Sequence, residues 1–511
     1  MEPVVGIDLG TTSSLVAWVN PKTGLPECFT GPEGSASCPS VVGMDSEGRF
    51  AVGGPAHRQL VAHPERTIAS PKRLLGCTAT ELSKHPALQS RVEAGPGAAR
   101  IRIGERKCAT PEIAAIILRE LKTWAEMALG RPLGMAAIAV PANFNQAQRL
   151  ATRDAARLAG FSKVWLPSEP AAAALAYGTL QKRRGTIAVC DFGGGTFDVS
   201  LIKLAADAQG RPLCEVLATA GDPRLGGDDM DEALTEMACA EIRRDFGIDL
   251  SQRRDALHEL RKTLARAKHE LSAAHQTQVH YPLGKAGLYV RVISRTDLEA
   301  VIAPLVERAA RCAATALAGA GVEAPALDEL ILLGGCTRIP LVRRVLAQAF
   351  EREPRAIVET GQSVALGGAL WAASLDKSGS QRTLRDVAPF AISATSASGP
   401  AEEIIPRNVP LPAAARRSFA LRRGSSRCEL ALRECPPGTP LSAVAPLARI
   451  RLSVAKSRAA GAPARTASIE AHFLMDENGI LHVLAPGRNA EEWRAVEVRP
   501  SAALRAPRSK K

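Results

Sequence analysis

The sequence of 511 residues is short of aromatic side chains, of long apolar runs and of closely spaced cysteines. Phe, Trp and Tyr make up only 4% of it, so the cores must be built mainly from Ala, Leu, Val and Ile. No stretch approaches the roughly eighteen uninterrupted apolar residues of a membrane-spanning helix. The cysteines are scattered without a Cys-x-x-Cys pair, which argues against a disulfide framework and a zinc site. We therefore expect a cytoplasmic protein with reduced thiols and no membrane partner.

Basic residues gather toward the C-terminal end of the chain. The net charge is +13, and residues 381–511 contain 21 Lys and Arg against 11 Asp and Glu. The arginines of this region are dispersed and lack the interleaved aromatic residues of many nucleic-acid-binding surfaces. We interpret the basic excess as a solvated surface, and nucleic acid is not an expected partner.

The length and the pattern of apolar residues indicate at least two domains. Strands and helices alternate over residues 1–375, which is typical of an α/β domain whose sheets are covered by helices. Residues 376–388 begin with small and polar residues and are interpreted as an interdomain linker. Short alternating runs, including 428–432, 449–454, 468–474 and 480–484, then predict an all-β sandwich over 389–499. A basic tail is expected at 500–511.

Several predicted helices have recognisable start and stop residues. One is expected to begin with Thr110 as its cap and to end at Gly130. Another, made of small residues, is predicted from Glu169 to Tyr177, with Gly178 as its stop.

Two segments about 180 residues apart share one design, VVGIDLGTTSS from Val4 and IAVCDFGGGTFDVS from Ile187. Each contains an apolar strand ending in Asp-x-Gly, a turn of small residues with Thr, and a second strand. The repetition predicts a duplicated domain with two lobes. Turns rich in Gly and Thr expose N–H and hydroxyl groups, so two facing turns would hold a polyphosphate. Asp8 and Asp191, at the strand ends, would place carboxylates near Mg²⁺.

Taken alone, each of these features has an ordinary structural explanation. A single Gly-rich hairpin is more often simply a tight turn, and neither turn matches a Walker loop or the dinucleotide-binding fingerprint. Two further glycine pairs, Gly226-Gly227 and Gly334-Gly335, lie where an apolar strand gives way to a helix. A helix N-terminus at such a place can face an anionic ligand, so the pairs strengthen the prediction of a phosphate site.

Five segments occur in a recognisable order and spacing over the first 375 residues: DLGTTSS at Asp8, VPANFN at Val140, SEPAAAALAYG at Ser168, DFGGGTFDVS at Asp191 and LLGGCTRIP at Leu332. Together they resemble the signature set of the 70-kDa heat-shock chaperones, the DnaK family, within the actin and sugar-kinase superfamily. The resemblance implies a duplicated actin-like (ribonuclease H-like) ATPase domain with two lobes, followed by an all-β sandwich that binds polypeptides. It also implies slow, regulatory hydrolysis of ATP to ADP in an ATP-dependent molecular chaperone.

The resemblance further implies roles for single residues in binding and hydrolysing ATP. Phosphate and adenosine contacts are implied for Asp8, Gly10, Thr11, Thr12, Gly193, Gly194, Gly195, Thr196, Gly226, Gly227, Lys268, Ser272, Gly334, Gly335, Arg338 and Ile339. Asp8 and Asp191 would hold Mg²⁺ chiefly through water. The implied catalytic set is Lys72, Glu169, Asp191, Thr196 and Asp198. Within it, Lys72 would neutralise charge near the γ-phosphate, while Glu169 and Asp198 would orient the attacking water and K⁺.

Pro141 and Arg149 match a family switch that reports the nucleotide state to the second domain. The segments IIPRNVPLP at Ile404 and MDENGILHVLA at Met475 resemble the family's β-sandwich, in which an extended peptide would be held by main-chain hydrogen bonds. The implied partners are therefore unfolded or extended polypeptides, a J-domain co-chaperone and a nucleotide-exchange factor.

The sequence departs from the family pattern in three places. Ala265 and Gly361 stand where the family has acidic residues, one of which contacts adenosine, which predicts weaker nucleotide binding. The linker segment Arg382–Val387 has one leucine and two arginines and predicts a poor apolar latch between the domains. The family's helical lid is missing, and the tail after Arg499 is too short to close over the peptide cleft in its place. This departure predicts fast client exchange or a narrow client set.

Two other functions fit parts of the sequence. The same superfamily contains small-molecule kinases, and a fold does not fix a function. A kinase would need a substrate-facing general base beside the γ-phosphate. An ATP-regulated scaffold without client cycling is favoured by the missing lid and the altered linker. Stimulation of ATP hydrolysis by peptide distinguishes the chaperone from both alternatives.

Overall fold

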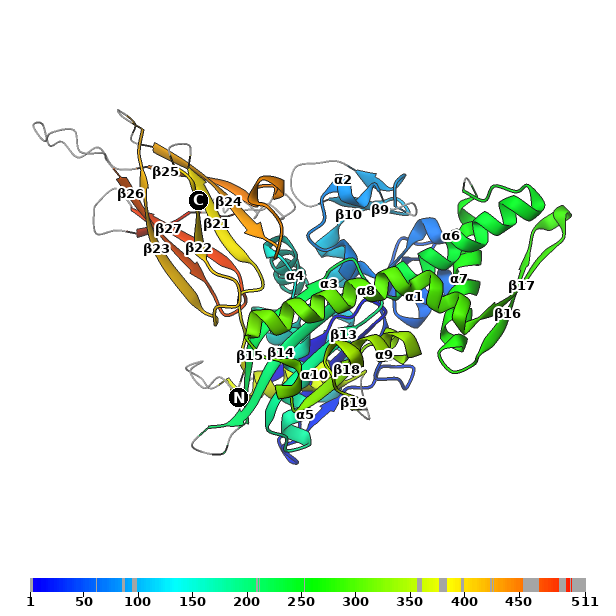
Figure 1. The fold of residues 1–511 in the computed structure, drawn as a ribbon, viewed down its shortest axis with the longest axis horizontal. Helices are drawn as coiled ribbons and strands as arrows, with labels where there is room; N and C mark the ends of the chain where they lie inside the picture. The colour runs from blue at the N-terminus through cyan, green and yellow to red at the C-terminus, as the bar shows by residue number, and fades with distance from the viewer. Residues whose placement is uncertain are drawn as a thin grey trace, which may run out of the picture.

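Two six-stranded sheets, which share the order of five of their strands, form the frame of the N-terminal part of the chain (Figure 1). The computed structural model describes residues 3–60, 62–84, 88–93, 99–207, 210, 212–251, 253–355, 361–375, 384–396, 399–422, 425, 427–453, 468–486, 493–496 and 498. The predicted tail and most of the predicted linker, 376–383, lie outside these residues.

The first sheet has the order β12-β11-β1-β2-β3, with β4 paired to β2, and the second has the order β19-β18-β13-β14-β15-β20. In each sheet the first strand of a hairpin pairs in parallel with a later strand on one side and antiparallel with its hairpin partner on the other. The strands are β1 (Val4–Asp8), β2 (Ser13–Val19), β3 (Pro26–Cys28), β4 (Cys38–Pro39), β11 (Met135–Ala139), β12 (Lys163–Trp165), β13 (Gly185–Phe192), β14 (Phe197–Ala206), β15 (Pro212–Asp222), β18 (Glu329–Leu333), β19 (Pro354–Arg355) and β20 (Leu384–Arg385). The matching order agrees with the duplication predicted from the repeated hairpins.

Helices α5 (Glu169–Leu180) and α10 (Ser363–Ser374) pack against each other between the two sheets. Small residues allow this close approach: a Cβ on Gly367 would lie 1.7 Å from the carbonyl oxygen of Ala172. Likewise, a Cβ on Gly6 would lie 2.1 Å from the backbone nitrogen of Ala369. We call the first sheet and its helices lobe I, with α10 on its inner face, and the second sheet and its helices lobe II, with α5 on its inner face.

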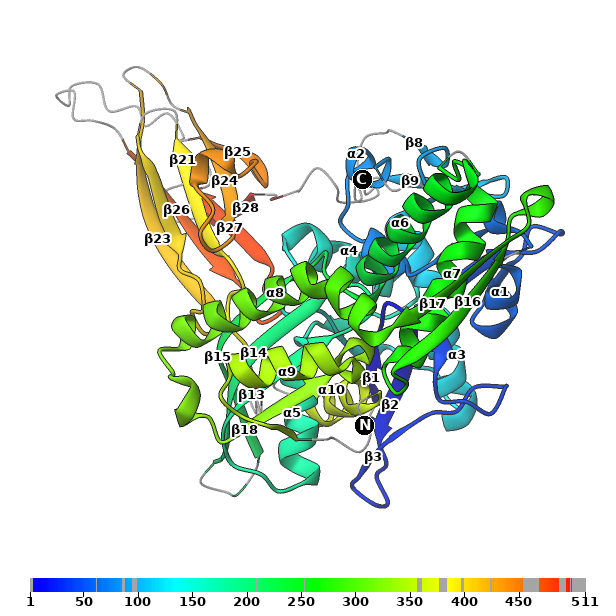
Figure 2. The same cartoon turned by 45° about the vertical axis from the view of Figure 1, so that its right-hand side comes forward.

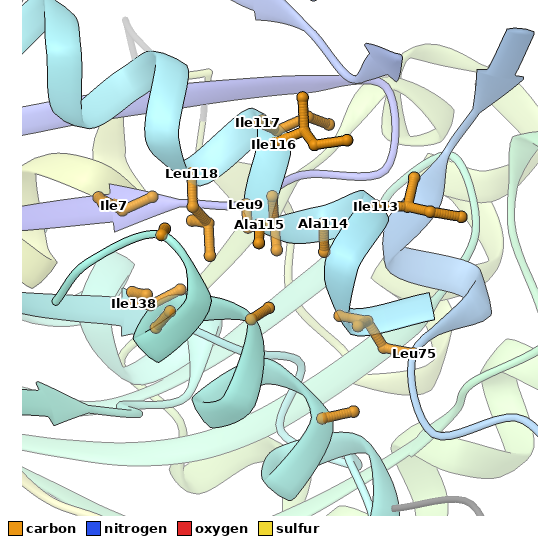
Figure 3. Packing of buried hydrophobic residues seen from close by; sticks show 14 of the residues in the cluster. Ile7, Leu9, Leu75, Ile113, Ala114, Ala115, Ile116, Ile117, Leu118 and Ile138 are labelled. Carbon is orange, nitrogen blue, oxygen red and sulfur yellow. The ribbon is translucent and has the colours of Figure 1, made fainter. Parts of the chain in front are cut away.

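The outer faces of the sheets are covered by longer helices. Helices α3 (Thr110–Leu129) and α4 (Gln146–Leu158) pack on lobe I, and α8 (Arg295–Ala320) and α9 (Pro340–Ala349) pack together on lobe II. Figure 3 shows part of the lobe I core, in which Leu118 of α3 lies near Ile7 and Ile138 of the sheet. The core residues are mostly aliphatic, as the low aromatic content predicts.

Smaller units extend each lobe. They comprise α1 (Gly54–Gln59), α2 (Ala79–Leu82), β5 (Val41–Met44), β6 (Phe50–Val52), β7 (Thr67–Ala69), β8 (Val92–Glu93), β9 (Arg100–Ile103) and β10 (Arg106–Ala109) in lobe I, and α6 (Gly227–Phe246), α7 (Arg254–Leu271), β16 (Gln276–Pro282) and β17 (Leu288–Ser294) in lobe II. Figure 2 shows the β16–β17 hairpin at the far end of lobe II. No helix in the described parts of the chain combines the length and the apolar character needed to cross a membrane.

Two predicted helix ends are wrong. Helix α3 has Ala109, not Thr110, as its N-cap, and Glu112 accepts the Ala109 backbone N–H at 2.7 Å, so the hydroxyl of Thr110 is not used as a cap. Helix α5 continues past Gly178 to Leu180. Gly178 is required by packing rather than as a stop, because a Cβ there would lie 3.2 Å from the methyl groups of Leu204.

The C-terminal part of the chain is a sandwich of two four-stranded sheets, with orders β22-β21-β24-β25 and β23-β26-β27-β28. All four runs predicted as strands are strands. The bounds are β21 (Ala391–Ser396), β22 (Ala401–Ile405), β23 (Ala413–Ala420), β24 (Arg427–Cys435), β25 (Ala448–Ser453), β26 (Ser468–Met475), β27 (Leu481–Pro486) and β28 (Trp493–Val496). Aliphatic residues and the pair Phe419 and Phe473 fill the space between the sheets. In Figures 1 and 2 one end of the sandwich lies beside α4 and α8.

Candidate functional site

The two predicted phosphate turns face each other across the gap between the lobes. The first turn, Gly10–Thr12, follows β1, and the second, Gly193–Thr196, joins β13 to β14. A Cβ on Gly194 would lie 2.8 Å from the hydroxyl oxygen of Thr12, and one on Gly195 would lie 3.1 Å from the Cγ2 of Thr11. The turns are therefore close enough to contact one ligand together.

The two further glycine pairs lie directly behind the second turn. Gly227 N–H and Asp228 N–H, at the start of α6, donate to the carbonyl oxygens of Gly193 and Gly194 at 3.1 and 2.8 Å. Gly334 has a φ of +84°, and a Cβ there would lie 2.3 Å from the carbonyl oxygen of Phe192. Gly334 is followed by a short 3₁₀ turn, η5 (Gly335–Arg338), which precedes α9. These contacts fix the backbone of the second turn from the lobe II side.

A cluster of one lysine and four carboxylates lies beside the turns; Lys72, Glu169 and Asp198 are buried, and Asp8 and Asp191 are half-buried. Lys72, in the 3₁₀ turn η2 (Pro71–Leu74), forms an ion pair with Glu169, the first residue of α5. Asp8 ends β1, and Asp191 and Asp198 lie opposite each other on β13 and β14. Asp198 accepts hydrogen bonds from the backbone and side-chain nitrogens of Asn143 at 3.1 and 2.9 Å. All predicted catalytic carboxylates are thus brought together.

Burial and mutual repulsion raise the pKa values of these carboxyl groups. Burial, with added repulsion from Glu169, raises the pKa of Asp8 and of Asp198 to about 8 and that of Asp191 to about 7. Burial alone would lower the pKa of Lys72, but Glu169 and Asp8 outweigh it and raise this pKa. Four acidic side chains face the one ammonium group of Lys72. Bound cations would therefore offset the excess negative charge of this site.

The cluster fits a magnesium-bound polyphosphate held partly through water. Among the described residues, no group of three His, Cys, Asp or Glu side chains is placed to ligate a metal ion directly. Mg²⁺ retains several water ligands in many phosphate sites, so carboxylates such as Asp8 and Asp191 can act on it through those waters. The glycine and threonine turns supply neutral hydrogen-bond donors on the opposite side.

The residues predicted to contact adenosine lie farther along lobe II. Lys268 is buried, with its Nζ 2.7 Å from Asp231 and 2.8 Å from the carbonyl oxygen of Gly227. Ser272 is the C-cap of α7, and its hydroxyl donates to the Lys268 carbonyl at 3.4 Å. Arg338 is exposed at the end of η5, whereas Ile339 is buried in the lobe II core. The structure therefore places Arg338 free to contact a base and Lys268 in a buried ion pair.

The predicted switch residue Arg149 connects lobe I to the sandwich. Its guanidinium is buried and donates to the carbonyl oxygens of Phe144 at 3.0 Å and Ala142 at 3.2 Å. The Nη1 of Arg149 donates to the carbonyl oxygen of Asn478, in the turn between β26 and β27, at 3.0 Å. Pro141 lies in the same loop, where its carbonyl accepts the Phe144 N–H at 3.0 Å. Pro141 thus lies in the loop before α4, and Arg149, near the start of α4, holds that loop and contacts the sandwich.

Sequence reasoning missed several residues of this interface. The side-chain amide of Gln146 donates to the Gly479 carbonyl and accepts the Leu481 N–H at 2.8 Å. The carboxylate of Glu434 accepts the Gln146 backbone N–H with both oxygens at 3.0 Å. Burial raises the pKa of Glu434 to about 7 against the opposing effects of this N–H and of Arg149. Ile480 reaches into the lobe I core, so the sandwich is anchored by apolar as well as polar contacts.

The end of the predicted linker is docked in lobe II. β20 pairs in parallel with β15, matching Leu384 with Cys214. Leu384 and Val387 are buried in the core that contains Trp165 and Trp371. Asp386 accepts the Ser168 backbone N–H at 3.0 Å, directly before Glu169. The sequence predicts a poor latch from its single leucine, but strand pairing and this hydrogen bond supply contacts that a count of leucines does not reveal.

The fold and the site define a two-lobed α/β unit docked on a β-sandwich, with paired glycine-threonine turns beside a lysine–carboxylate cluster in the gap between the lobes. Comparison with protein-family models then gives the family: the model described as Hsp70 protein matches residues 4–510. The chain belongs to the Hsp70 family. Members of this family are chaperones and ATPases that generally use ATP and ADP with Mg²⁺.

Gly226→Ala is expected to weaken the binding of Mg·ATP roughly tenfold or more, because overpacking displaces backbone. A Cβ on Gly226 would lie 2.4 Å from the Gly195 nitrogen and 2.5 Å from the Gly194 carbonyl, so the second turn must move. Titration calorimetry measures the affinity. Gly399→Ala is the control, since the nearest atom to its Cβ is the Ser396 hydroxyl at 3.4 Å. Equal affinities of the two variants would contradict the assignment of this turn.

Proposed function

We propose that this protein is an ATP-dependent molecular chaperone of the DnaK type, which binds and hydrolyses ATP to control its binding of unfolded polypeptides. The observation that carries the proposal is the switch loop, residues 140–145, together with Arg149 at the start of α4: the loop contacts the carboxylate cluster, and Arg149 joins it to the sandwich. A movement of residues at the phosphate site would be transmitted to the sandwich through the contacts of this loop. Membership in the family supplies the functional context.

In the proposed hydrolysis, the ammonium group of Lys72 neutralises negative charge that develops on the transferred phosphoryl group. Glu169 and Asp198 accept hydrogen bonds from the attacking water and orient it in line. Thr196 and the second turn donate hydrogen bonds to phosphate oxygens. When bound, Mg²⁺ would be held through water by Asp8 and Asp191 and would neutralise phosphate charge, and K⁺ would add to this neutralisation near Glu169 and Asp198. The burial of Lys72 and Glu169 keeps their geometry fixed.

Two contacts connect this chemistry to the switch loop. The Val140 carbonyl accepts the Glu169 N–H at 2.8 Å, and Asn143 donates to Asp198. Arg149 then holds the same loop against Asn478 of the sandwich. Movement of the Asp198 carboxylate, or of the backbone at Glu169, therefore displaces the loop and changes the fit of the sandwich. We propose this displacement as the coupling between the two sites.

The sandwich also contacts lobe II, so its docking depends on the relative position of the two lobes. Arg407 donates to the Thr219 carbonyl of β15, and Asn408 accepts the Thr219 N–H at 3.3 Å. The Gln146 and Arg149 contacts lie on lobe I. Because both sets form together only at one lobe arrangement, ATP binding that closes the lobes would favour docking. Docking would in turn reshape the polypeptide site on the sandwich.

Single-turnover hydrolysis of ATP with and without an unfolded peptide tests the proposed function. Acceleration by peptide is expected, because client binding to the sandwich disturbs contacts that restrain the switch loop. Phosphorylation of a small sugar or acid instead would identify a kinase. Binding of ATP with no response to peptide would identify a scaffold and contradict client cycling.

Leu384→Ala is expected to weaken docking of the linker by about 2 kcal/mol or more, because it removes a buried leucine side chain. Trp165 and Trp371 share the same core, so their fluorescence emission should shift toward longer wavelength. Arg385→Ala on the same strand is the matched control, since Arg385 is exposed. An unchanged emission spectrum for Leu384→Ala, with peptide stimulation intact, would show that β20 docking is not part of the coupling.

A further inference from the structure

Arg73, the residue after the proposed catalytic lysine, spans the cleft between the lobes. Its guanidinium lies 3.0 Å from the carboxylate of Asp228 and 3.3 Å from that of Asp229, both in the first turn of α6 in lobe II. The three side chains are 23 to 30% exposed, so the ion pairs are partly shielded from water. Burial alone would lower the pKa of Arg73, but the two aspartates outweigh it and raise this pKa.

The stem of Arg73 also packs against the second phosphate turn. A Cβ on Gly195 would lie 2.8 Å from the Cδ of Arg73, so the glycine leaves room for this side chain. The turn is held on its other side by Asp228, whose backbone N–H donates to Gly194 at 2.8 Å. Arg73 therefore contacts the turn and the helix that supports it at the same time.

The backbone around Arg73 is held firmly in lobe I. Leu74 and Leu75 are buried in the lobe I core, and the Ser70 backbone N–H donates to Ser40 at 3.0 Å. Asp229 is similarly fixed in lobe II, because its carboxylate accepts the Gly226 N–H at 2.8 Å. Since both ends are anchored, the lobes cannot separate at this point without breaking the ion pairs.

A second ion pair crosses the same cleft but is more exposed. Arg224 of lobe II lies 2.9 Å from Glu81 of α2, and their side chains are 62% and 41% exposed. Exposed ion pairs contribute little, because water and salt screen them. The Glu81–Arg224 pair is thus a natural comparison for the better shielded contacts of Arg73.

We propose that Arg73 is a cross-lobe positioning residue that limits the rate at which bound nucleotide leaves the cleft; this rests on the proposed function. Release of the phosphates requires the two turns to separate, and the Arg73 ion pairs must break as they do. Hydrolysis takes place with the cleft closed, when the pairs are intact, and Arg73 makes no contact with the carboxylate cluster among the described interactions. Loss of Arg73 therefore accelerates release and leaves the chemical step nearly unchanged.

Stopped-flow release of a fluorescent N-methylanthraniloyl-ADP, complexed with Mg²⁺ and chased with unlabelled ATP, tests this inference. Arg73→Ala is expected to release the probe roughly tenfold faster or more, as for the loss of charge-assisted hydrogen bonds. Arg73→Lys should lie between Arg73→Ala and the native protein, because it keeps the charge without the fork of donors. Arg224→Ala should change the rate by less than about twofold.

A double-mutant cycle identifies the partner. Asp228→Asn should accelerate release, and combining it with Arg73→Ala should add little, because both changes remove the same contact. Single-turnover hydrolysis of pre-bound ATP should stay within about threefold of native in Arg73→Ala, as expected for a change outside the chemical step. Circular dichroism confirms folding, and Asp228→Asn carries the test if Arg73→Ala does not fold.

The outcomes separate the inference from the proposed function. If the native protein does not bind the probe, the proposed function fails. If it binds the probe and Arg73→Ala releases it at the native rate, the assignment of Arg73 is wrong. Normal release combined with lost hydrolysis would instead place Arg73 in the chemical step and also overturn the inference.

Discussion

Lys72→Ala is expected to reduce single-turnover ATP hydrolysis by roughly 100-fold or more, the usual scale for removing a group that stabilises transition-state charge. Lys72 contacts the carboxylate cluster through its ion pair with Glu169. Binding of Mg·ATP should persist, because the glycine-threonine turns and the Asp8 and Asp191 carboxylates remain. Quenched-flow measurement of phosphate formation and calorimetric titration of Mg·ATP measure the two effects separately.

Lys203→Ala is the matched control for this variant. Lys203 is an exposed lysine on β14, so its removal changes the net charge equally without touching the cluster. Hydrolysis by Lys203→Ala should remain close to native. Unchanged turnover in Lys72→Ala would overturn the catalytic role of Lys72, and simultaneous loss of ATP binding would show that the lysine holds the ligand rather than the transition state.

Arg149→Ala is expected to abolish most of the acceleration of hydrolysis by unfolded peptide. The substitution leaves the carbonyl oxygens of Ala142, Phe144 and Asn478 without this donor. Truncating one partner of a buried charged hydrogen bond typically costs about 2 to 5 kcal/mol, enough to free the sandwich from lobe I. Single-turnover hydrolysis, measured over a range of peptide concentrations, reports the loss.

Arg157→Ala provides the comparison, because Arg157 lies on the same helix α4 but is exposed. Peptide should stimulate this variant as it stimulates the native protein. Full peptide stimulation in Arg149→Ala would show that the contact with Asn478 does not carry the coupling. Loss of stimulation in both variants would point to a general weakening of α4.

The repeated hairpins and the glycine pairs could be predicted from sequence because their signals are local. Asp-x-Gly at a strand end and a run of Gly and Thr describe a turn within a few residues, and the matched sheet orders follow from the repetition. The two misplaced helix ends show the limit of such signals. Gly178 serves close packing on Leu204 instead of ending a helix, and that neighbour is distant in the sequence.

The interface between the lobes and the sandwich could not be predicted from local patterns. Gln146 contacts Glu434, Gly479 and Leu481, which lie more than 280 residues away and show no shared periodicity. The contacts of Arg73 could not be predicted either, since an arginine beside a lysine is ordinarily a surface residue. Only the placement of α6 across the cleft reveals its partners.

A crystal structure with Mg²⁺ and a non-hydrolysable ATP analogue tests the central claim most directly. The account predicts a triphosphate contacted by both Gly10–Thr12 and Gly193–Thr196, with the cation near Asp8 and Asp191 and the ammonium of Lys72 beside the terminal phosphate. An analogue bound to one turn only, or at another place on the molecule, would contradict it.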